Sequence, residues 1–238
     1  MSPLLDRLRG RPAGSALHPI KLRAIDATLE RPDVHSVADL GGIWAVDGGY
    51  TFHALERHAP ERAVLVDEQV TDATRERAQR FAQLEIVEGN FGDPATAGRV
   101  GEVDAVILFD VLLHQVSPDW DDVLRMYAER ARYLIVVQPQ YVLGDRTVRL
   151  LDLGRERYLE LVPEVPEHHE VWNRMDEYLP ERGRKYRDIH NIWQWGMTDA
   201  DLRRRTDELG LELVYYENAG MWLDRPAFEN HAFVFRRR

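Results

Sequence analysis

Cysteine is absent from this sequence of 238 residues. A chain without cysteine has no disulfide framework, no thiolate nucleophile and no cysteine-ligated metal. Long apolar runs are missing as well, since none approaches the ~20 residues that a membrane-spanning helix needs. The opening residues, MSPLLD, lack the continuous apolar core of a signal peptide. We therefore expect a cytoplasmic protein without a membrane-bound part.

Positive charge is in deficit. The chain carries 31 Lys and Arg against 41 Asp and Glu, which gives a formal net charge of −10. Such a chain repels polyphosphate unless it has a local basic patch, so the composition argues against nucleic acid as a partner. The apolar share of 44% is ordinary for a globular protein, and the length fits one large domain with a sizeable core.

Short apolar runs alternate with helical patterns along most of the chain. The runs predict strands at 36–40, 62–66, 84–87, 103–109, 133–137, 211–216 and 231–235. Helices are expected at 17–30, 50–58, 70–82, after an N-cap at Ser117, and at 198–209 after an N-cap at Thr198. Apolar runs separated by helices indicate a parallel sheet covered on both faces. The alternating pattern of the last two runs is typical of an antiparallel edge.

Three parts of the chain differ in composition and in the spacing of their apolar residues. Residues 1–33 form a polar arm followed by an amphipathic helix, and residues 34–238 carry the strand and helix alternation. Within the second part, residues 141–195 break the rhythm and predict two helices inserted between the fifth strand and the last helix. The N-terminal arm and helix also offer a surface through which a homodimer could form.

A glycine-bearing turn follows the first predicted strand. Gly41 and Gly42 come directly after it, and Gly49 opens the next helix. Glycine lets the backbone approach a ligand closely, and the start of the helix supplies N–H donors. Asp67 ends the second strand 18 residues beyond Gly49, where an acid can bind ribose hydroxyls. The pattern predicts a nucleotide-type cofactor site.

The same turn distinguishes between two classes of cofactor. The Gly-x-Gly-x-x-Gly signature of nicotinamide enzymes is absent, and the loop 43–47 is too long for a tight pyrophosphate turn. Asp39 stands two residues before Gly41, and an acid there suits a cationic or amine-bearing ligand better than a pyrophosphate. A nicotinamide oxidoreductase is therefore the least favoured of the enzyme classes considered.

With these residues in place, the sequence resembles the class I S-adenosylmethionine-dependent methyltransferases, over roughly residues 34–140 and 190–238. The family's first motif, an acid followed by x-Gly-x-Gly, matches Asp39 to Gly42, with Ile43 at the place of the second glycine. The resemblance implies S-adenosylmethionine as the cofactor. It also implies a Rossmann-like α/β three-layer sandwich, with a seven-stranded, mostly parallel sheet, an antiparallel last strand and a helical insertion.

Two later segments extend the resemblance. Residues 88–91 match the family's adenine-binding segment, which implies that Asn90 binds the adenine amine and Phe91 stacks on its ring. Residues 110–114 match the segment after the family's fourth strand, and we count Asp110 among the cofactor-binding residues. His114 closes this segment at the mouth of the expected site. We predict that it is the catalytic general base, with a structural role in the loop as the alternative.

Metal assistance is not expected. A metal-dependent methyltransferase of the catechol type places carboxylates after both the fourth and the fifth strands. Asp110 could serve after the fourth, but the fifth ends in Gln138, Pro139 and Gln140. We predict that the transfer is independent of metal, with no metal ligand among the site residues. The adjacent His168 and His169 are interpreted as part of a solvated helix face.

The acceptor pocket is expected under the insertion, which in this family commonly covers the acceptor. We predict that it is lined by Tyr141 and by His190, Trp193 and Trp195 from an aromatic, amide-rich loop. For the two tryptophans, a role as core anchors is an equally weighted alternative.

The preferred function is methyl transfer to an oxygen or nitrogen of a small-molecule acceptor. The acidic charge and the inserted lid favour it, and an Asn-Pro-Pro-Tyr type motif is missing after the fourth strand. The first alternative is methylation of RNA, such as a tRNA base, which needs a local basic patch. The second is a non-catalytic protein that uses the cofactor fold to bind a partner.

Overall fold

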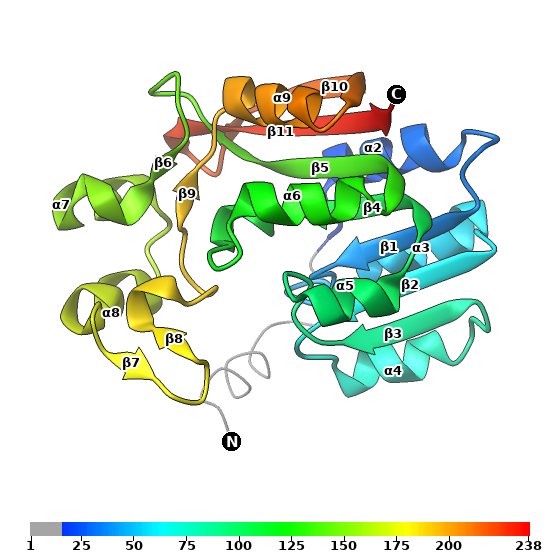
Figure 1. Cartoon of the computed structure of the whole chain (residues 1–238), viewed down its shortest axis with the longest axis horizontal. Coiled ribbons are helices and arrows are strands. Elements are labelled where there is room, and N and C mark those ends of the chain that lie inside the picture. Colours follow the sequence, from blue (N-terminus) through cyan, green and yellow to red (C-terminus); the bar gives the residue numbers. More distant parts are fainter. Residues whose placement is uncertain (1–15) are drawn as a thin grey trace.

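The apolar runs of the sequence become the strands of one seven-stranded sheet in the computed structural model, which describes residues 16–238. The strand order is β10-β11-β5-β4-β1-β2-β3 (Figure 1). The strands are β1 (Ser36–Leu40), β2 (Arg62–Asp67), β3 (Leu84–Glu88), β4 (Val103–Phe109), β5 (Ala131–Tyr141), β10 (Leu211–Trp222) and β11 (Arg225–Arg237). The first five are parallel, and β11 runs antiparallel to both β5 and β10. The predicted fold class is confirmed.

Helices cover the sheet on both faces, as the unbroken apolar strands require. One face packs against α2 (Pro19–Leu29), α3 (Gly49–His58) and α4 (Asp72–Ala78). The other packs against α5 (Pro94–Val100), α6 (Trp120–Ala128) and α9 (Asp199–Glu208). Because the strands present alternate side chains to the two faces, each layer has its own apolar core. The carboxyl ends of the five parallel strands meet at one edge, which we call the carboxyl edge.

The helix starts were predicted with mixed success. Thr198 caps α9 as expected, its hydroxyl accepting a hydrogen bond from the amide of Asp201 at 3.2 Å. The predicted N-cap at Ser117 is wrong: α6 begins at Trp120, and Ser117 has φ of 53°, outside the extended conformation that an N-cap adopts. Helix α5 was not predicted, because it has only seven residues and contains Gly98.

The insertion forms a lobe beyond the carboxyl edge, on the left of Figure 1. Its elements are β6 (Val148–Arg149), η2 (Leu150–Leu153), α7 (Arg155–Leu161), α8 (Pro166–Arg174), β7 (Tyr178–Leu179), β8 (Arg184–Lys185), η3 (Tyr186–Asp188) and β9 (Trp195–Gly196). The two α-helices agree with the sequence pattern. The pairs β6–β9 and β7–β8 were not predicted, since two-residue strands are too short to show a period. A separate apolar cluster around Tyr158 and Trp193 holds the lobe together.

Residues 1–15, which make up nearly all of the predicted polar arm, lie outside the described residues. The helix that follows them, α2, packs against α3 and against β4, β5, β10 and β11. Among residues 16–238, no helix combines the length and the apolar character needed to cross a bilayer.

Candidate active site

The glycine turn after β1 is tightly packed at the carboxyl edge. Gly41 has φ of 72°, a conformation that favours glycine, and its amide donates to the carbonyl of Val66 at 2.7 Å. A Cβ on Gly41 would lie 2.7 Å from a methyl carbon of Val111. A Cβ on Gly42 would lie 2.5 Å from Oδ2 of Asp39. No larger residue fits at either position without displacing its neighbours.

The irregular loop between this turn and α3 folds back on itself. The amides of Val46 and Asp47 donate to the carbonyl oxygen of Ile43 at 3.2 and 2.9 Å. Asp47 and Gly48 both have positive φ, which reverses the chain before the helix begins. Gly49 opens α3, and a Cβ on it would lie 2.6 Å from a methyl carbon of Leu17, just before α2. The loop is therefore a compact turn, and its glycines serve packing as well as ligand approach.

Two of the predicted cofactor acids lie at the ends of neighbouring strands. Asp39 is almost fully buried in β1, and its Oδ2 accepts a hydrogen bond from the Thr51 hydroxyl at 2.6 Å. Burial raises the pKa of Asp39 to about 6, against the Thr51 hydrogen bond, which lowers it. Asp67 at the end of β2 accepts from the amide of Ile43 at 3.1 Å and from that of Gln69 at 3.0 Å. Burial also raises its pKa.

The third acid, Asp110, pairs with a lysine that the sequence did not single out. Nζ of Lys21 lies 2.5 Å from Oδ2 of Asp110 and 5.2 and 5.4 Å from the ring centres of Tyr50 and Phe109. Burial lowers the pKa of Lys21, but the Asp110 carboxylate outweighs burial, and the net shift is upward. Lys21 occupies the apolar stripe of α2, three residues before the buried Ala24. A lysine on the apolar face of a predicted helix is the sequence signal that could have identified Lys21.

His114 ends the 3-10 turn η1 (Leu112–His114) that follows β4. Its Nδ1 lies 2.8 Å from the carbonyl oxygen of Ile192. A carbonyl only accepts hydrogen bonds, so Nδ1 must carry the proton, and Nε2 of the neutral ring is left with a lone pair. Burial lowers the pKa of His114, with the Ile192 hydrogen bond acting the other way. This is the protonation state that a general base requires, and the geometry agrees with that prediction without testing it.

The predicted adenine-side residues lie next to the glycine turn. Phe91 is largely buried, and its ring edge would be 3.5 Å from a Cβ on Gly41. Asn90 accepts a hydrogen bond from the amide of Gly92 at 2.7 Å and donates to Glu68 at 3.0 Å. The carboxyl edge thus brings together the predicted cofactor residues of β1, β2, the segment after β3 and the segment after β4.

Two of the predicted acceptor residues link the insertion to the segment after β4. Nε2 of His190 accepts a hydrogen bond from the guanidinium of Arg184 at 2.5 Å. Burial, together with the positive charge of Arg184, lowers the pKa of His190 to about 4. Nε1 of Trp195 donates to the carbonyl of Gln115 at 2.6 Å. The guanidinium of Arg184 also donates to the carbonyl of Val116 at 3.2 Å, so Trp195 and the pair of Arg184 with His190 both hold the insertion over the carboxyl edge.

The other two predicted acceptor residues differ in burial: Trp193 is buried and Tyr141 is half-buried. Trp193 is 6% exposed, and its ring centre lies 4.9 Å from that of Trp222 and 5.1 Å from that of Phe228. This is the core-anchor position that we weighed as an alternative. Tyr141 ends β5, and its amide donates to the carbonyl of Met197 at 2.6 Å. An acceptor-binding role for these residues remains a prediction.

The histidine pair on α8 divides between core and surface. His169 is exposed, as the solvated-face interpretation predicts. For His168 that interpretation is wrong, because the side chain is 2% exposed. Its Nδ1 donates to the carbonyl of Pro163 at 2.7 Å, and its Nε2 accepts from the amide of Trp193 at 3.3 Å. Both ring nitrogens are used in packing α8, so His168 is a structural residue.

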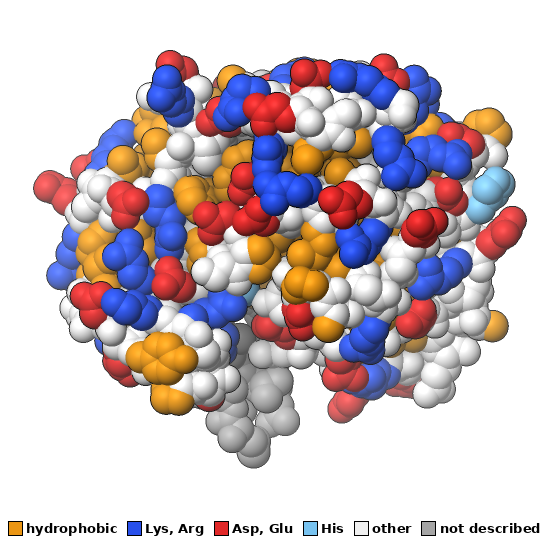
Figure 2. Space-filling model, in the orientation of Figure 1, with side chains coloured by type: hydrophobic (Ala, Val, Ile, Leu, Met, Phe, Trp, Pro, Cys, Tyr) orange, Lys and Arg blue, Asp and Glu red, His pale blue; other side chains and the backbone are white. Residues whose placement is uncertain are grey.

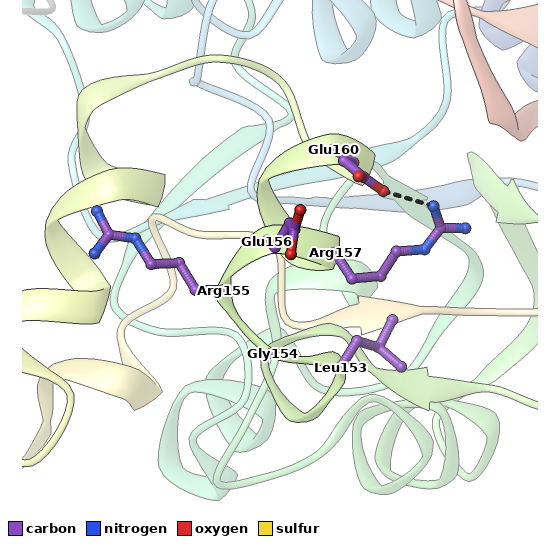
Figure 3. Close-up of a pocket in the computed structure, with 6 residues that line it drawn as sticks. All are labelled: Leu153, Gly154, Arg155, Glu156, Arg157 and Glu160. Carbon is purple, nitrogen blue, oxygen red and sulfur yellow. Dashed lines mark hydrogen bonds and ion pairs between the residues drawn. The ribbon is translucent and has the colours of Figure 1, made fainter.

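A hollow on the surface of the insertion does not belong to this site. It is lined by residues 153–157 and Glu160, all from one segment around the start of α7. Figure 3 shows the Arg157 guanidinium joined to the Glu160 carboxylate, while Arg155 points away. No predicted site residue lines the hollow, so we do not regard it as a binding site.

The surface charge is mixed on the face shown in Figure 2, where basic and acidic side chains alternate over the sheet and the insertion. Several arginines of the described chain pair with acids of the same helix, among them Arg204 with Glu208 at 2.8 Å. A basic track of the kind that nucleic-acid binding uses is not visible on this face.

Of the comparisons with known proteins, the one with solved structures identifies the fold. Neither the models of known protein families nor the curated proteins give a match to this sequence. Among solved structures, a Burkholderia thailandensis 1,6-didemethyltoxoflavin-N1-methyltransferase, with 1,6-didemethyltoxoflavin and S-adenosylhomocysteine bound, matches with a TM-score of 0.58. The identity is 15%, over 92% of this chain and 77% of that one.

Two further structures show the same likeness. Magnesium protoporphyrin IX methyltransferase from Synechocystis, with S-adenosylhomocysteine bound, has a TM-score of 0.56 and 14% identity over 100% of this chain and 95% of its own. An O-methyltransferase family protein from Burkholderia thailandensis has a TM-score of 0.51 and 16% identity. The match covers 92% of this chain but only 56% of that one. With the sheet order and the glycine turn, these matches show that the chain has the fold of the S-adenosylmethionine-dependent methyltransferases.

Proposed function

We propose that this chain is an S-adenosylmethionine-dependent methyltransferase that acts on an oxygen or nitrogen of a small-molecule acceptor. The observation that carries the proposal is the meeting of the glycine turn with three carboxylates, Asp39, Asp67 and Asp110, at the carboxyl edge. In open α/β sheets this edge is where ligands bind. Two of the similar structures were solved with S-adenosylhomocysteine in place, which supports the same cofactor here.

The side chains at this edge fit such a cofactor. S-adenosylmethionine carries a positive sulfonium and an ammonium group, and three acids make the edge a better host for cations than for a pyrophosphate. Oδ1 of Asp110 is buried and has no hydrogen-bond partner among the described residues, so it is available to an N–H donor. Asp67 would accept from the ribose hydroxyls, and Asn90 and Phe91 would hold the adenine. Lys21, which pairs with Asp110, would meet the carboxylate of the cofactor's methionine part.

The bound cofactor supplies an electrophilic methyl group on sulfur. The chain itself must orient the acceptor and accept its proton. Nε2 of His114 has the free lone pair, and the Ile192 carbonyl fixes the orientation of the ring. Asp110 lies four residues before His114, and its charge favours the protonated ring that forms when the acceptor loses its proton.

We further propose that the transfer needs no metal. A hard cation at the acceptor would require oxygen ligands from the ends of both β4 and β5. Asp110 offers one, but the end of β5 carries no carboxylate, only the fully buried amides of Gln138 and Gln140. The amide nitrogen of Gln138 lies 2.9 Å from the sulfur of Met197, which ties this side chain to the segment before α9.

The insertion, residues 141–195, is proposed to be the lid that selects the acceptor. It is joined to the segment after β4 by three hydrogen bonds: His114 donates to the carbonyl of Ile192, Trp195 donates to the carbonyl of Gln115, and Arg184 donates to the carbonyl of Val116. An acceptor between the lid and the edge would meet Tyr141, His190 and Trp195, and Trp193 would support them from behind. Two of the similar structures are methyltransferases of small molecules, 1,6-didemethyltoxoflavin and magnesium protoporphyrin IX, and a small acceptor suits a covered pocket of this kind.

Calorimetry with S-adenosylhomocysteine tests the proposal. We expect one site per chain, and we expect Asp67→Ala to weaken binding at least about tenfold, because a buried acceptor of ribose hydroxyls is lost. Asp72→Ala is the matched control: it removes an exposed carboxylate at the start of α4 and should leave binding unchanged. If the unmodified protein does not bind the compound, the chain is a fold relative without the activity.

A further inference from the structure

A second cluster of chemically active side chains lies away from the carboxyl edge, between α2 and α3. Nε2 of His53 and Nε2 of His58 each lie 2.7 Å from Oδ1 of Asp26. One potential ligand atom from each residue lies within 4.8 Å of the others. The three side chains are only 19%, 8% and 22% exposed. Two imidazole nitrogens and a carboxylate oxygen form a donor set that zinc and related ions prefer.

The carboxylate is oriented from its other side. Oδ2 of Asp26 lies 3.2 Å from Nε of Arg57, so Oδ1 is left to face both histidines. An outer partner that fixes a ligating group in this way is typical of metal centres. Tetrahedral zinc with bonds of about 2.0–2.1 Å separates its ligand atoms by about 3.3 Å. Each imidazole nitrogen therefore needs to move away from Oδ1 of Asp26 by only about half an ångström, and the two nitrogens already lie within 4.8 Å of each other, so side-chain rotation can form the site.

The helices that carry the cluster are held independently of it. Ile25 and Leu29 of α2 pack in the same apolar core as Phe52 and Leu55 of α3. Because the backbone positions are set by this core, the ligands are brought together before any ion arrives. The cost of assembling the site is then small, which is the condition for useful affinity.

We propose that Asp26, His53 and His58 form a binding site for a divalent zinc-class ion, with water as the fourth ligand. The site is separate from the proposed transfer site. It shares no residue with the carboxyl edge, and the ion would clamp α2 onto α3. Lys21 stands on the same helix as Asp26, one turn earlier, so the clamp would also steady the lysine that pairs with Asp110.

The test uses the full chain after treatment with a chelator. Zinc chloride is titrated in, bound zinc is measured after dialysis, and thermal unfolding is recorded. We expect one zinc per chain and a rise in Tm of about 3–8 °C at saturating zinc. His53→Gln and Asp26→Asn should abolish both effects. His169→Gln, which removes an exposed histidine on α8, is the matched control and should keep both.

Cobalt(II) gives a second readout that does not depend on a variant that folds. Cobalt in a site with two imidazoles, a carboxylate and water gives intense visible absorption bands, and zinc should displace them. Absence of these bands in the unmodified protein, together with an unchanged Tm in zinc, would overturn the proposal. Equal zinc binding by His53→Gln and the unmodified chain would overturn it as well.

Discussion

Nζ of Lys21 and Oδ2 of Asp110 lie 2.5 Å apart and join α2 to the residue that follows β4. The side chain of Lys21 is 12% exposed and that of Asp110 is 38% exposed, so the pair sits at the margin of the core. Fully exposed ion pairs contribute little to the free energy of unfolding, and fully buried ones carry a large desolvation cost. This pair lies between the two cases. It fixes the position of Asp110, whose φ of 54° already turns the chain sharply at the carboxyl edge.

We therefore predict that Lys21→Met lowers the free energy of unfolding by about 1–2 kcal/mol, because it leaves Asp110 without its cation. Lys185→Met is the control, since Lys185 pairs with Asp176 at an exposed position and should cost less than about 0.5 kcal/mol. Urea unfolding of the three proteins measures both values. Equal effects of the two substitutions would contradict the prediction.

Asp39 makes the stability depend on pH in an identifiable way. Its pKa is about 6 in the folded chain and 3.8 as the reference value. Between these values the folded state keeps a proton that the unfolded state has lost, so stability falls as the pH rises from 4 to 7. We predict that, between pH 4 and pH 7, the free energy of unfolding of Asp39→Asn falls by about 2–3 kcal/mol less than that of the parent. Urea unfolding at pH 4 and pH 7 measures the difference between variant and parent. A difference that does not change with pH would contradict the prediction.

The same residues show what the sequence could predict. Asp39, Gly41, Gly42 and Asp67 stand at strand ends, and strands reveal themselves by apolar runs that need no tertiary information. Because parallel strands bring their carboxyl ends to one edge, the predicted cofactor residues converged without any contact being known.

Lys21 and the Asp26 cluster could not be found in that way. Their partners are 89, 27 and 32 residues away in the sequence, and only the packing of α2 on the sheet and on α3 brings them together. The sequence also left two roles open for Trp193, for a similar reason. The role of Trp193 as a core residue depends on Trp222 and Phe228 of the last two strands, which no local pattern connects to it.

Glycine at position 42 should be essential for both folding and cofactor binding. A Cβ there would lie 2.5 Å from Asp39 and 2.7 Å from Leu65, both in the sheet, so neither neighbour can move freely. We predict that Gly42→Ala costs about 1–3 kcal/mol of stability and weakens S-adenosylhomocysteine binding at least tenfold. Gly98→Ala is the matched control, because Gly98 is exposed in α5 and its Cβ meets nothing within 4 Å. It should stabilise the chain by about 0.5–1 kcal/mol and leave binding intact.

Gln194 should hold the insertion in shape. It is fully buried, its amide nitrogen donates to the carbonyls of Arg187 and Ile189, and its amide oxygen accepts from Arg149. We predict that Gln194→Leu costs about 2–4 kcal/mol, since it leaves the buried carbonyl of Ile189 and the partly buried Nε of Arg149 without a partner. Limited proteolysis should then cut within residues 141–195 first. Gln79→Leu changes an exposed residue and should alter neither the stability nor the cleavage pattern. Unchanged protease resistance of the Gln194 variant would count against this role.

His114 should control the pH dependence of methyl transfer. Since burial lowers its pKa below 6.5, the ring is neutral at pH 7 and above, with Nε2 free to accept a proton. The value of kcat/KM should therefore be level near pH 7–8 and should fall as the pH drops through the pKa and the base becomes protonated. His114→Gln should lower kcat by about 10²–10⁴-fold and abolish this acidic limb, because glutamine accepts no proton. The measurement follows labelled methyl transfer from S-adenosylmethionine to a panel of phenolic and heterocyclic N–H compounds, with His169→Gln as the control that should keep the parent profile. A His114→Gln enzyme that retains both the rate and the acidic limb would show that the imidazole only positions the loop through Ile192.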